Sequence, residues 1–144
     1  LLSARKKVGQ SATIHGIRDC DRHSGVTQEL ALTEFFQALT GRWPIFHYGP
    51  LDLGFIRQAL AGWDLRWPTL YWDTLTWQHQ RRTQRQEEVG HGELQLGQAR
   101  QYHRLPPRTA HNALDDALSC AELFLVLAAQ SRAQVGDSYS YWPG

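Results

Sequence analysis

The chain has 144 residues, of which 42% are hydrophobic and 20% are charged. This length suits one domain with a hydrophobic core, and the composition excludes a disordered chain. The formal net charge of +1 does not by itself indicate a nucleic-acid-binding protein. No apolar run approaches the roughly 20 residues that span a bilayer. The cysteines, Cys20 and Cys120, do not make a disulfide framework, so we expect a cytoplasmic protein with no membrane partner.

After a polar stretch at 1–25, short apolar runs that predict strands alternate with longer stretches of helical periodicity. In chain order we expect a helix over 28–39, a strand over 43–48, a helix over 50–60, a strand within 66–74, helices over 74–87 and 93–102, a loop at 104–109 and a long helix over 112–130. This order predicts an α/β domain at 1–130 and a C-terminal tail at 131–144. Two strands are few for so many helices, so we expect the first strands of the sheet to be missing from this sequence.

Two neighbouring aspartates open the last predicted helix. At about 100° per residue, Asp116 lies on an apolar face with Cys120, Leu123 and Leu127, and Asp115 lies on a polar face with Ser119 and Glu122. An inward-facing carboxylate needs a cation or strong hydrogen-bond donors. The alternative is an acid that is favoured by the helix dipole and lies at the edge of the core.

Asp52 repeats this pattern in the helix predicted over 50–60, where it shares a face with the apolar residues Phe55, Ile56 and Ala59. Two such acids predict carboxylates that converge at one rim of a sheet, where Mg²⁺ or Mn²⁺ could bind. His111 lies in the loop before Asp116 and is free to lean over the same rim. A histidine there could take a proton from a metal-bound water, although a solvated loop histidine is the more common case.

These motifs resemble those of the DEDDh-type 3′–5′ exonucleases, the group that includes RNase T and the proofreading epsilon subunit of bacterial DNA polymerase III. HNALDDAL is similar to the third motif of that family, and its His111, Ala113 and Asp116 fall on the motif positions. IHGI (14–17) and WDTL (72–75) are further landmarks. The resemblance covers about residues 8–130 and implies an RNase H-like fold, with a central mixed sheet flanked by helices.

The stretch FHYGPLDLGFI resembles the second motif of the family and aligns Asp52 with its metal ligand. It departs from the family pattern at Tyr48, Gly49 and Leu51, which stand where Asn, Ala and Phe are commonest. The Asp-x-Glu of the first motif does not occur in the sequence. Asp19 and Asp21 have a similar spacing, but they follow IHGI rather than precede it, so we do not expect them to substitute.

The resemblance implies hydrolysis of phosphodiesters at a single-stranded or frayed 3′ end of DNA or RNA, with two Mg²⁺ or Mn²⁺ ions held by four acids. Asp52 and Asp116 would be two of these ligands, and His111 would be the general base. Because the first-motif acids are missing, we expect the chain alone to be weak or inactive. A polymerase or another replication or repair protein is an expected partner.

Other side chains could contact the nucleic acid. Tyr48 is a candidate for stacking on a base, and Arg81, Arg82 and Arg85 could contact phosphates or form a solvated helix face. A non-catalytic module of the same fold, which would bind nucleic acid or protein, is the first alternative to an exonuclease. A zinc site built on Cys20 and His23 is a weaker alternative, because only Cys120 could add another thiolate.

Overall fold

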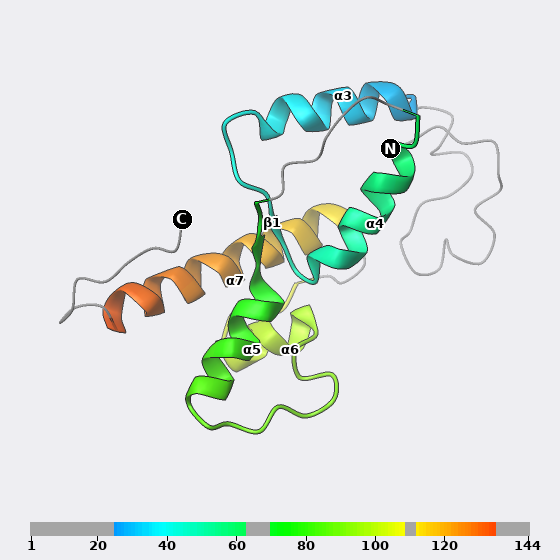
Figure 1. The fold of residues 1–144 in the computed structure, drawn as a ribbon. Coiled ribbons are helices and arrows are strands. Elements are labelled where there is room, and N and C mark those ends of the chain that lie inside the picture. Colours follow the sequence, from blue (N-terminus) through cyan, green and yellow to red (C-terminus); the bar gives the residue numbers. More distant parts are fainter. Residues whose placement is uncertain (1–24, 63–69, 109–111, 135–144) are drawn as a thin grey trace.

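The computed structural model describes residues 25–62, 70–108 and 112–134 of the chain. The fold is mixed α/β and mostly helical, with one small two-stranded parallel sheet. The elements follow the predicted order (Figure 1). They are α3 (Gln28–Leu39), β1 (Ile45–Phe46), α4 (Gly49–Ala59), β2 (Trp72–Asp73), α5 (Thr74–Gln84), α6 (Leu96–Tyr102) and α7 (Ala113–Gln134).

Both strands lie where the sequence predicts them but are shorter, with Ile45 paired to Trp72 and Phe46 paired to Asp73. Each strand ends because a helix begins almost at once. Tyr48 turns the chain with a φ of 70° and is the N-cap of α4, and Asp73 is the N-cap of α5. The prediction from apolar character alone therefore made both strands too long.

Several helix ends also differ from the prediction. α5 ends at Gln84, and Gln86, with a φ of 58°, carries the chain out of the helical conformation. α7 continues to Gln134, so the boundary that we predicted at residue 130 falls inside this helix. No helix in the described ranges is both long enough and apolar enough to cross a membrane.

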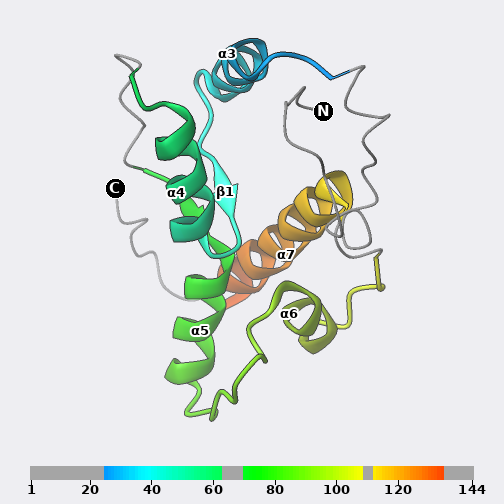
Figure 2. The same ribbon diagram turned by 90° about the vertical axis from the view of Figure 1, so that its right-hand side faces the viewer.

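The core lies between α5, α6 and α7, which pack against one another (Figure 2). Ala99 of α6 and Leu123 and Leu127 of α7 are fully buried there. Leu123 and Leu127 confirm the predicted apolar face of α7, whereas Ser119, which we expected on the polar face, is buried as well. It is buried because the guanidinium of α6 residue Arg100 covers it and donates a hydrogen bond to its carbonyl.

An aromatic cluster joins this core to the sheet. Trp72 of β2 packs against Trp77 of α5 and Phe124 of α7, with ring centroids 5.2 and 5.8 Å apart. Trp77 and Phe124 also contact each other, at 5.6 Å. Aromatic pairs at these distances are favourable beyond the area that they bury. The cluster therefore holds the short sheet against the helices.

The predicted apolar face of α4 is wrong at Phe55, whereas Ile56 and Ala59 are half-buried as expected. Phe55, which we placed on the core side with Asp52, is 65% exposed, and the buried side chain of this helix is Leu53. Leu53 is about 100° around the helix from Asp52, so Asp52 lies at the edge of the buried face rather than at its centre. α3 lies apart from α5 and α6, and its Gln28 amide donates to the carbonyl of Ala59 (Figures 1 and 2).

Candidate functional site at the strand ends

The candidate site lies where β1 and β2 end. Because the strands are parallel, their carboxyl ends meet at one edge of the sheet, and α4 and α5 both begin there. α7 also packs against β1. In open α/β sheets, ligands bind outside the carboxyl ends of the strands. The first turns of α4 and α5 therefore define the place to look for functional groups.

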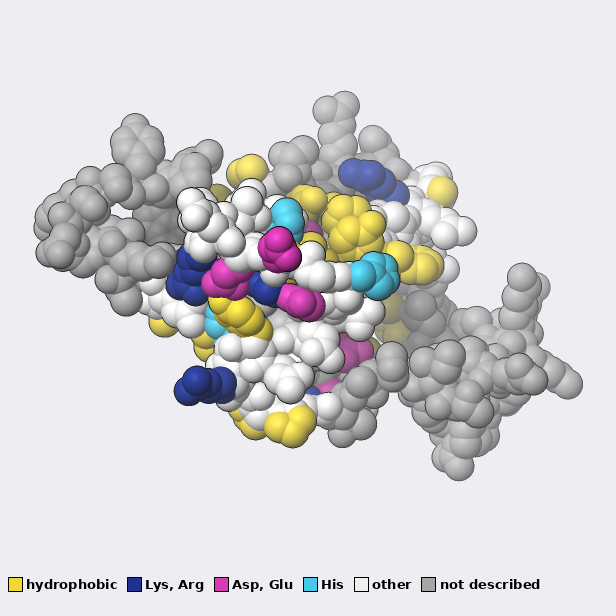
Figure 3. Space-filling model, turned by 90° about the horizontal axis from the view of Figure 1, so that it is seen from below, with side chains coloured by type: hydrophobic (Ala, Val, Ile, Leu, Met, Phe, Trp, Pro, Cys, Tyr) yellow, Lys and Arg dark blue, Asp and Glu magenta, His cyan; other side chains and the backbone are white. Residues whose placement is uncertain are grey.

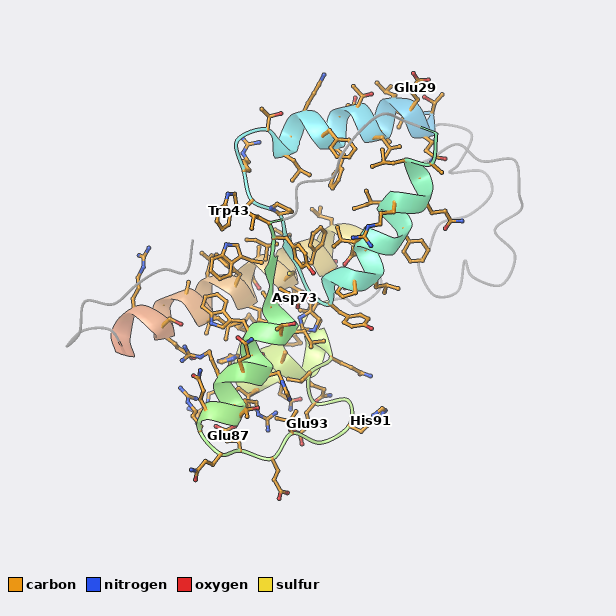
Figure 4. All side chains as sticks on the ribbon, in the orientation of Figure 1. Glu29, Trp43, Asp73, Glu87, His91 and Glu93 are labelled. Carbon is orange, nitrogen blue, oxygen red and sulfur yellow. The ribbon has the colours of Figure 1, made fainter. Side chains whose placement is uncertain are left out.

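Asp73 ties the two helix starts together. Its Oδ1 accepts hydrogen bonds from the backbone N–H groups of Leu75 and Thr76, which cap α5. Oδ1 also accepts from Tyr48 N–H, and Oδ2 accepts from Gly49 N–H at 2.8 Å, which caps the start of α4. One carboxylate thus satisfies donors of two helices, and Figure 4 shows Asp73 at this junction. In the sequence, Asp73 stands out only as part of the landmark WDTL.

Gly49 explains one departure from the exonuclease pattern. A Cβ at this position would lie 2.7 Å from Cε2 of Tyr71, so alanine would force the ring or the helix start to move. At Tyr48, in contrast, the backbone conformation does not favour the residue that is present. Its left-handed backbone favours Asn, and tyrosine is uncommon in this conformation. The glycine is therefore required by its neighbour, whereas the tyrosine is held in a strained conformation.

His47 is half-buried and belongs to a chain of hydrogen-bonded polar groups at the strand ends. Its Nε2 lies 2.7 Å from the carbonyl of Leu94, so Nε2 carries a proton and donates. Its Nδ1 lies 2.9 Å from the hydroxyl of Thr74, which also reaches the carbonyl of Phe46. Burial lowers the pKa of His47, which favours the neutral ring. This ring therefore anchors the loop before α6 to the sheet.

Cys120 of α7 borders the same chain, with its Sγ 3.7 Å from Oγ1 of Thr74. It is a free cysteine, and burial raises the pKa of its thiol. Zinc needs a thiolate, so this environment does not favour a zinc ligand. Cys20 and His23, the other residues of that alternative, lie outside the described residues.

Asp52 is half-buried in the first turn of α4. Burial raises the pKa of Asp52 above its ordinary value, and the charge of Asp73 raises it further. Its own backbone N–H and His47 act in the opposite direction. The charges of Asp73 and Asp52 also raise the pKa of Cys120, so all these groups lie close enough to interact. Asp52 is thus a carboxylate whose charge the surrounding protein compensates poorly.

Asp116 is half-buried in the first turn of α7, one turn before Cys120. The described part of the chain shows no direct interaction between Asp116 and Asp52. The predicted convergence of these two acids therefore stays a prediction. Asp115 is half-buried like Asp116, and its carboxylate pairs with Arg108 across 3.6 Å. His111 lies outside the described residues.

The three arginines proposed to contact phosphates differ in their exposure to solvent. Arg81 and Arg82 are 9% and 8% exposed, so they form neither a solvated face nor an open phosphate-binding surface. Arg85 and Tyr48 are exposed and could reach a ligand in solution. Sequence periodicity could not distinguish these arginines, because their burial depends on the distant segments that cover them.

Among residues 25–62, 70–108 and 112–134, no three His, Cys, Asp or Glu side chains form a group that could hold a metal ion. Asp52 and Asp116 offer oxygen ligands of the kind that Mg²⁺ and Mn²⁺ prefer, but too few of them for a two-ion centre.

No protein-family model matches the chain, and neither the curated proteins nor the solved structures contain a significant match.

Proposed function

We propose that this chain supplies two of the four carboxylates of a DEDDh-type 3′–5′ exonuclease with an RNase H-like fold. The observation that carries the proposal is the position of Asp52, half-buried in the first turn of α4 at the carboxyl edge of a parallel strand pair. Asp116 lies in the first turn of α7 and is the aspartate of the motif that begins at His111. The reaction would be hydrolysis of phosphodiesters at the 3′ end of a DNA or RNA strand.

The described residues fit this role only in part, because two carboxylates cannot hold two divalent ions in a fixed geometry. The other two acids would have to come from outside the 144 residues, as no Asp-x-Glu occurs within them. What the chain does provide is positioning. Asp73 fixes the start of α4, and thereby the backbone that carries Asp52. The exposed ring of Tyr48 lies beside this helix start and could stack on a base.

Calorimetric titration of the chain with Mn²⁺ tests the proposed metal role. We expect weak binding that is lost in Asp52→Asn and in Asp116→Asn. Asp115→Asn is the matched control, because it removes a charge from the same helix turn, where Asp115 pairs with Arg108. Equal binding by all these variants would contradict the proposal, and so would the absence of binding in the unmodified chain.

A second measurement addresses the reaction. Single-stranded DNA and RNA labelled at the 5′ end should be shortened slowly or not at all by the chain alone. Adding a segment that carries the first-motif acids should produce stepwise shortening from the 3′ end. Failure of such a complemented chain, with metal binding intact, would favour the alternative of a non-catalytic module that binds nucleic acid or protein. The small number of ligands in the described residues is the observation that favours that alternative.

A further inference from the structure

Among the described residues, three arginines are buried around the α5–α6–α7 core, and their surroundings differ. Arg100 is 4% exposed and pairs with Glu122 at 2.7 Å. Arg82 pairs with Glu87 at 3.0 Å and with Glu93 at 2.6 Å, in the loop after α5. Figure 4 labels both glutamates, and Figure 3 shows acidic and basic side chains side by side on this face. Burial of a guanidinium is expensive unless a carboxylate or another anion accompanies it.

Arg81 is the exception. It is 9% exposed, and its hydrogen bond goes to a neutral group, the hydroxyl of Ser131, from Nη1 at 2.7 Å. No carboxylate pairs with Arg81 among the described residues, and its Nη2 has no hydrogen-bond partner. Burial lowers the pKa of Arg81, and the charge of Arg85 lowers it further. Arg81 is therefore a buried permanent charge with no carboxylate partner in the described part of the chain.

Other buried polar atoms without a hydrogen-bond partner occur at the same α5–α6–α7 junction. Gln78 lies one turn before Arg81 on α5, is 1% exposed, and leaves both its amide nitrogen and its oxygen unpaired. His103, at the end of α6, leaves Nε2 unpaired, and Gln130 leaves Oε1 unpaired. Gln130 bonds to His103 and is the chain neighbour of Ser131, which binds Arg81. Burial lowers the pKa of His103, and the charge of Arg81 lowers it further.

The hydrogen-bonding roles of these atoms favour an anion. The amide nitrogen of Gln130 lies 3.2 Å from Nδ1 of His103 and donates to it, which places the proton of the neutral ring on Nε2. Three unpaired donors result, on Arg81, Gln78 and His103. The unpaired amide oxygens of Gln78 and Gln130 need a donor in return. A tetrahedral oxyanion that keeps a hydroxyl group satisfies both requirements.

We propose that the α5–α6–α7 junction binds one hydrogen phosphate ion, through Arg81, Gln78 and His103. Such an ion supplies the missing negative charge to Arg81, accepts from the three unpaired donors and donates from its hydroxyl to an amide oxygen. This site is separate from the strand-end carboxylates and does not depend on the proposed exonuclease role. It also assigns Arg81 to a single buried anion rather than to the backbone of a nucleic acid.

Thermal unfolding of the full chain in sodium phosphate, sulfate and chloride at equal ionic strength tests the proposal. We expect a saturable rise in Tm of about 3–5 °C in phosphate over chloride, with a smaller rise in sulfate, which lacks the hydroxyl. The rise should disappear in Arg81→Met and persist in Arg57→Met. Arg57 is exposed on α4, so its replacement changes the net charge equally without touching the site.

Titration calorimetry with inorganic phosphate provides a second readout. Gln78→Leu should weaken phosphate binding at least tenfold, which keeps the proposal testable if Arg81→Met does not fold. The proposal is overturned if Tm is the same in phosphate and chloride, or if Arg81→Met keeps the full phosphate effect. In either case water would satisfy the unpaired atoms. Equal affinity for sulfate would contradict the role given to the amide oxygens.

Discussion

The strand edge and the α5–α6–α7 junction each hold neighbouring side chains of the same charge, and in both regions only some of them are satisfied. At the strand edge, Asp73 accepts hydrogen bonds from four backbone N–H groups, whereas Asp52 interacts mainly with its own backbone. At the junction, Arg82 has two carboxylate partners and Arg81 has none among the described residues.

The comparison teaches that burial alone does not mark a functional group. A buried charge whose bonds are all supplied by the fold has a structural role, because nothing is left for a ligand to satisfy. A buried charge with unmet bonds raises the energy of the folded protein until a partner arrives. By this criterion Asp52 and Arg81 are the candidates for ligand binding, and Asp73, Arg82 and Arg100 hold the fold together.

The largest expected effect comes from Arg100→Met. Arg100 donates to the carbonyls of Ser119 and Pro106 and pairs with Glu122, so the variant should lose about 3 kcal/mol of unfolding free energy. Arg81→Met in phosphate-free buffer should change that free energy by less than about 1 kcal/mol, because it removes an uncompensated charge. Urea denaturation measures both. Equal losses would remove the distinction between the two arginines.

Asp73→Ala should have the next largest effect. It removes the cap of α5 and the bond to the start of α4, so we expect a loss of about 2 kcal/mol in unfolding free energy. Asp52→Asn in the same helix start should not destabilise the protein. Urea denaturation of the two variants at neutral pH provides the comparison, and a large loss in Asp52→Asn would show that Asp52 has a structural role.

Opposite pH dependence should separate satisfied from unsatisfied carboxylates. Hydrogen bonds from Arg108 and Arg100 lower the pKa of Glu122 to about 2, so its stabilisation is present above its ordinary pKa and is lost as the pH falls toward 2. The pKa of Asp52 is raised, so its penalty is absent in acid and appears as the pH rises through its folded-state pKa.

Denaturation as a function of pH measures this difference. Glu122→Gln should flatten the acid side of the stability profile, and Asp52→Asn should increase stability at pH 7 but not in acid, below the ordinary pKa of an aspartate. If both variants shifted the pH profile of stability in the same direction, the distinction between a satisfied Glu122 and an unsatisfied Asp52 would be contradicted.

The smallest expected effect is at Tyr48. Tyr48→Asn places a residue suited to the left-handed conformation at a half-exposed position, so we expect a gain of about 0.5 kcal/mol. Gly49→Ala is the contrasting variant and should destabilise the protein, because its Cβ would meet the ring of Tyr71. Thermal unfolding of both variants shows whether each substitution raises or lowers the stability. A loss in Tyr48→Asn would mean that the tyrosine ring makes a compensating contact.

The sequence by itself determined the order of the elements, the helix at 28–39 and the apolar face of α7 that includes Leu123 and Leu127. These features depend on periodicity and on residues close in the chain. Only the tertiary structure decided that Leu53 rather than Phe55 is buried and that Asp73 caps two helices. It also decided that Arg82 has carboxylate partners where Arg81 has none among the described residues. The physical reason is that the partners of a buried polar group come from distant segments, and local patterning carries no information about them.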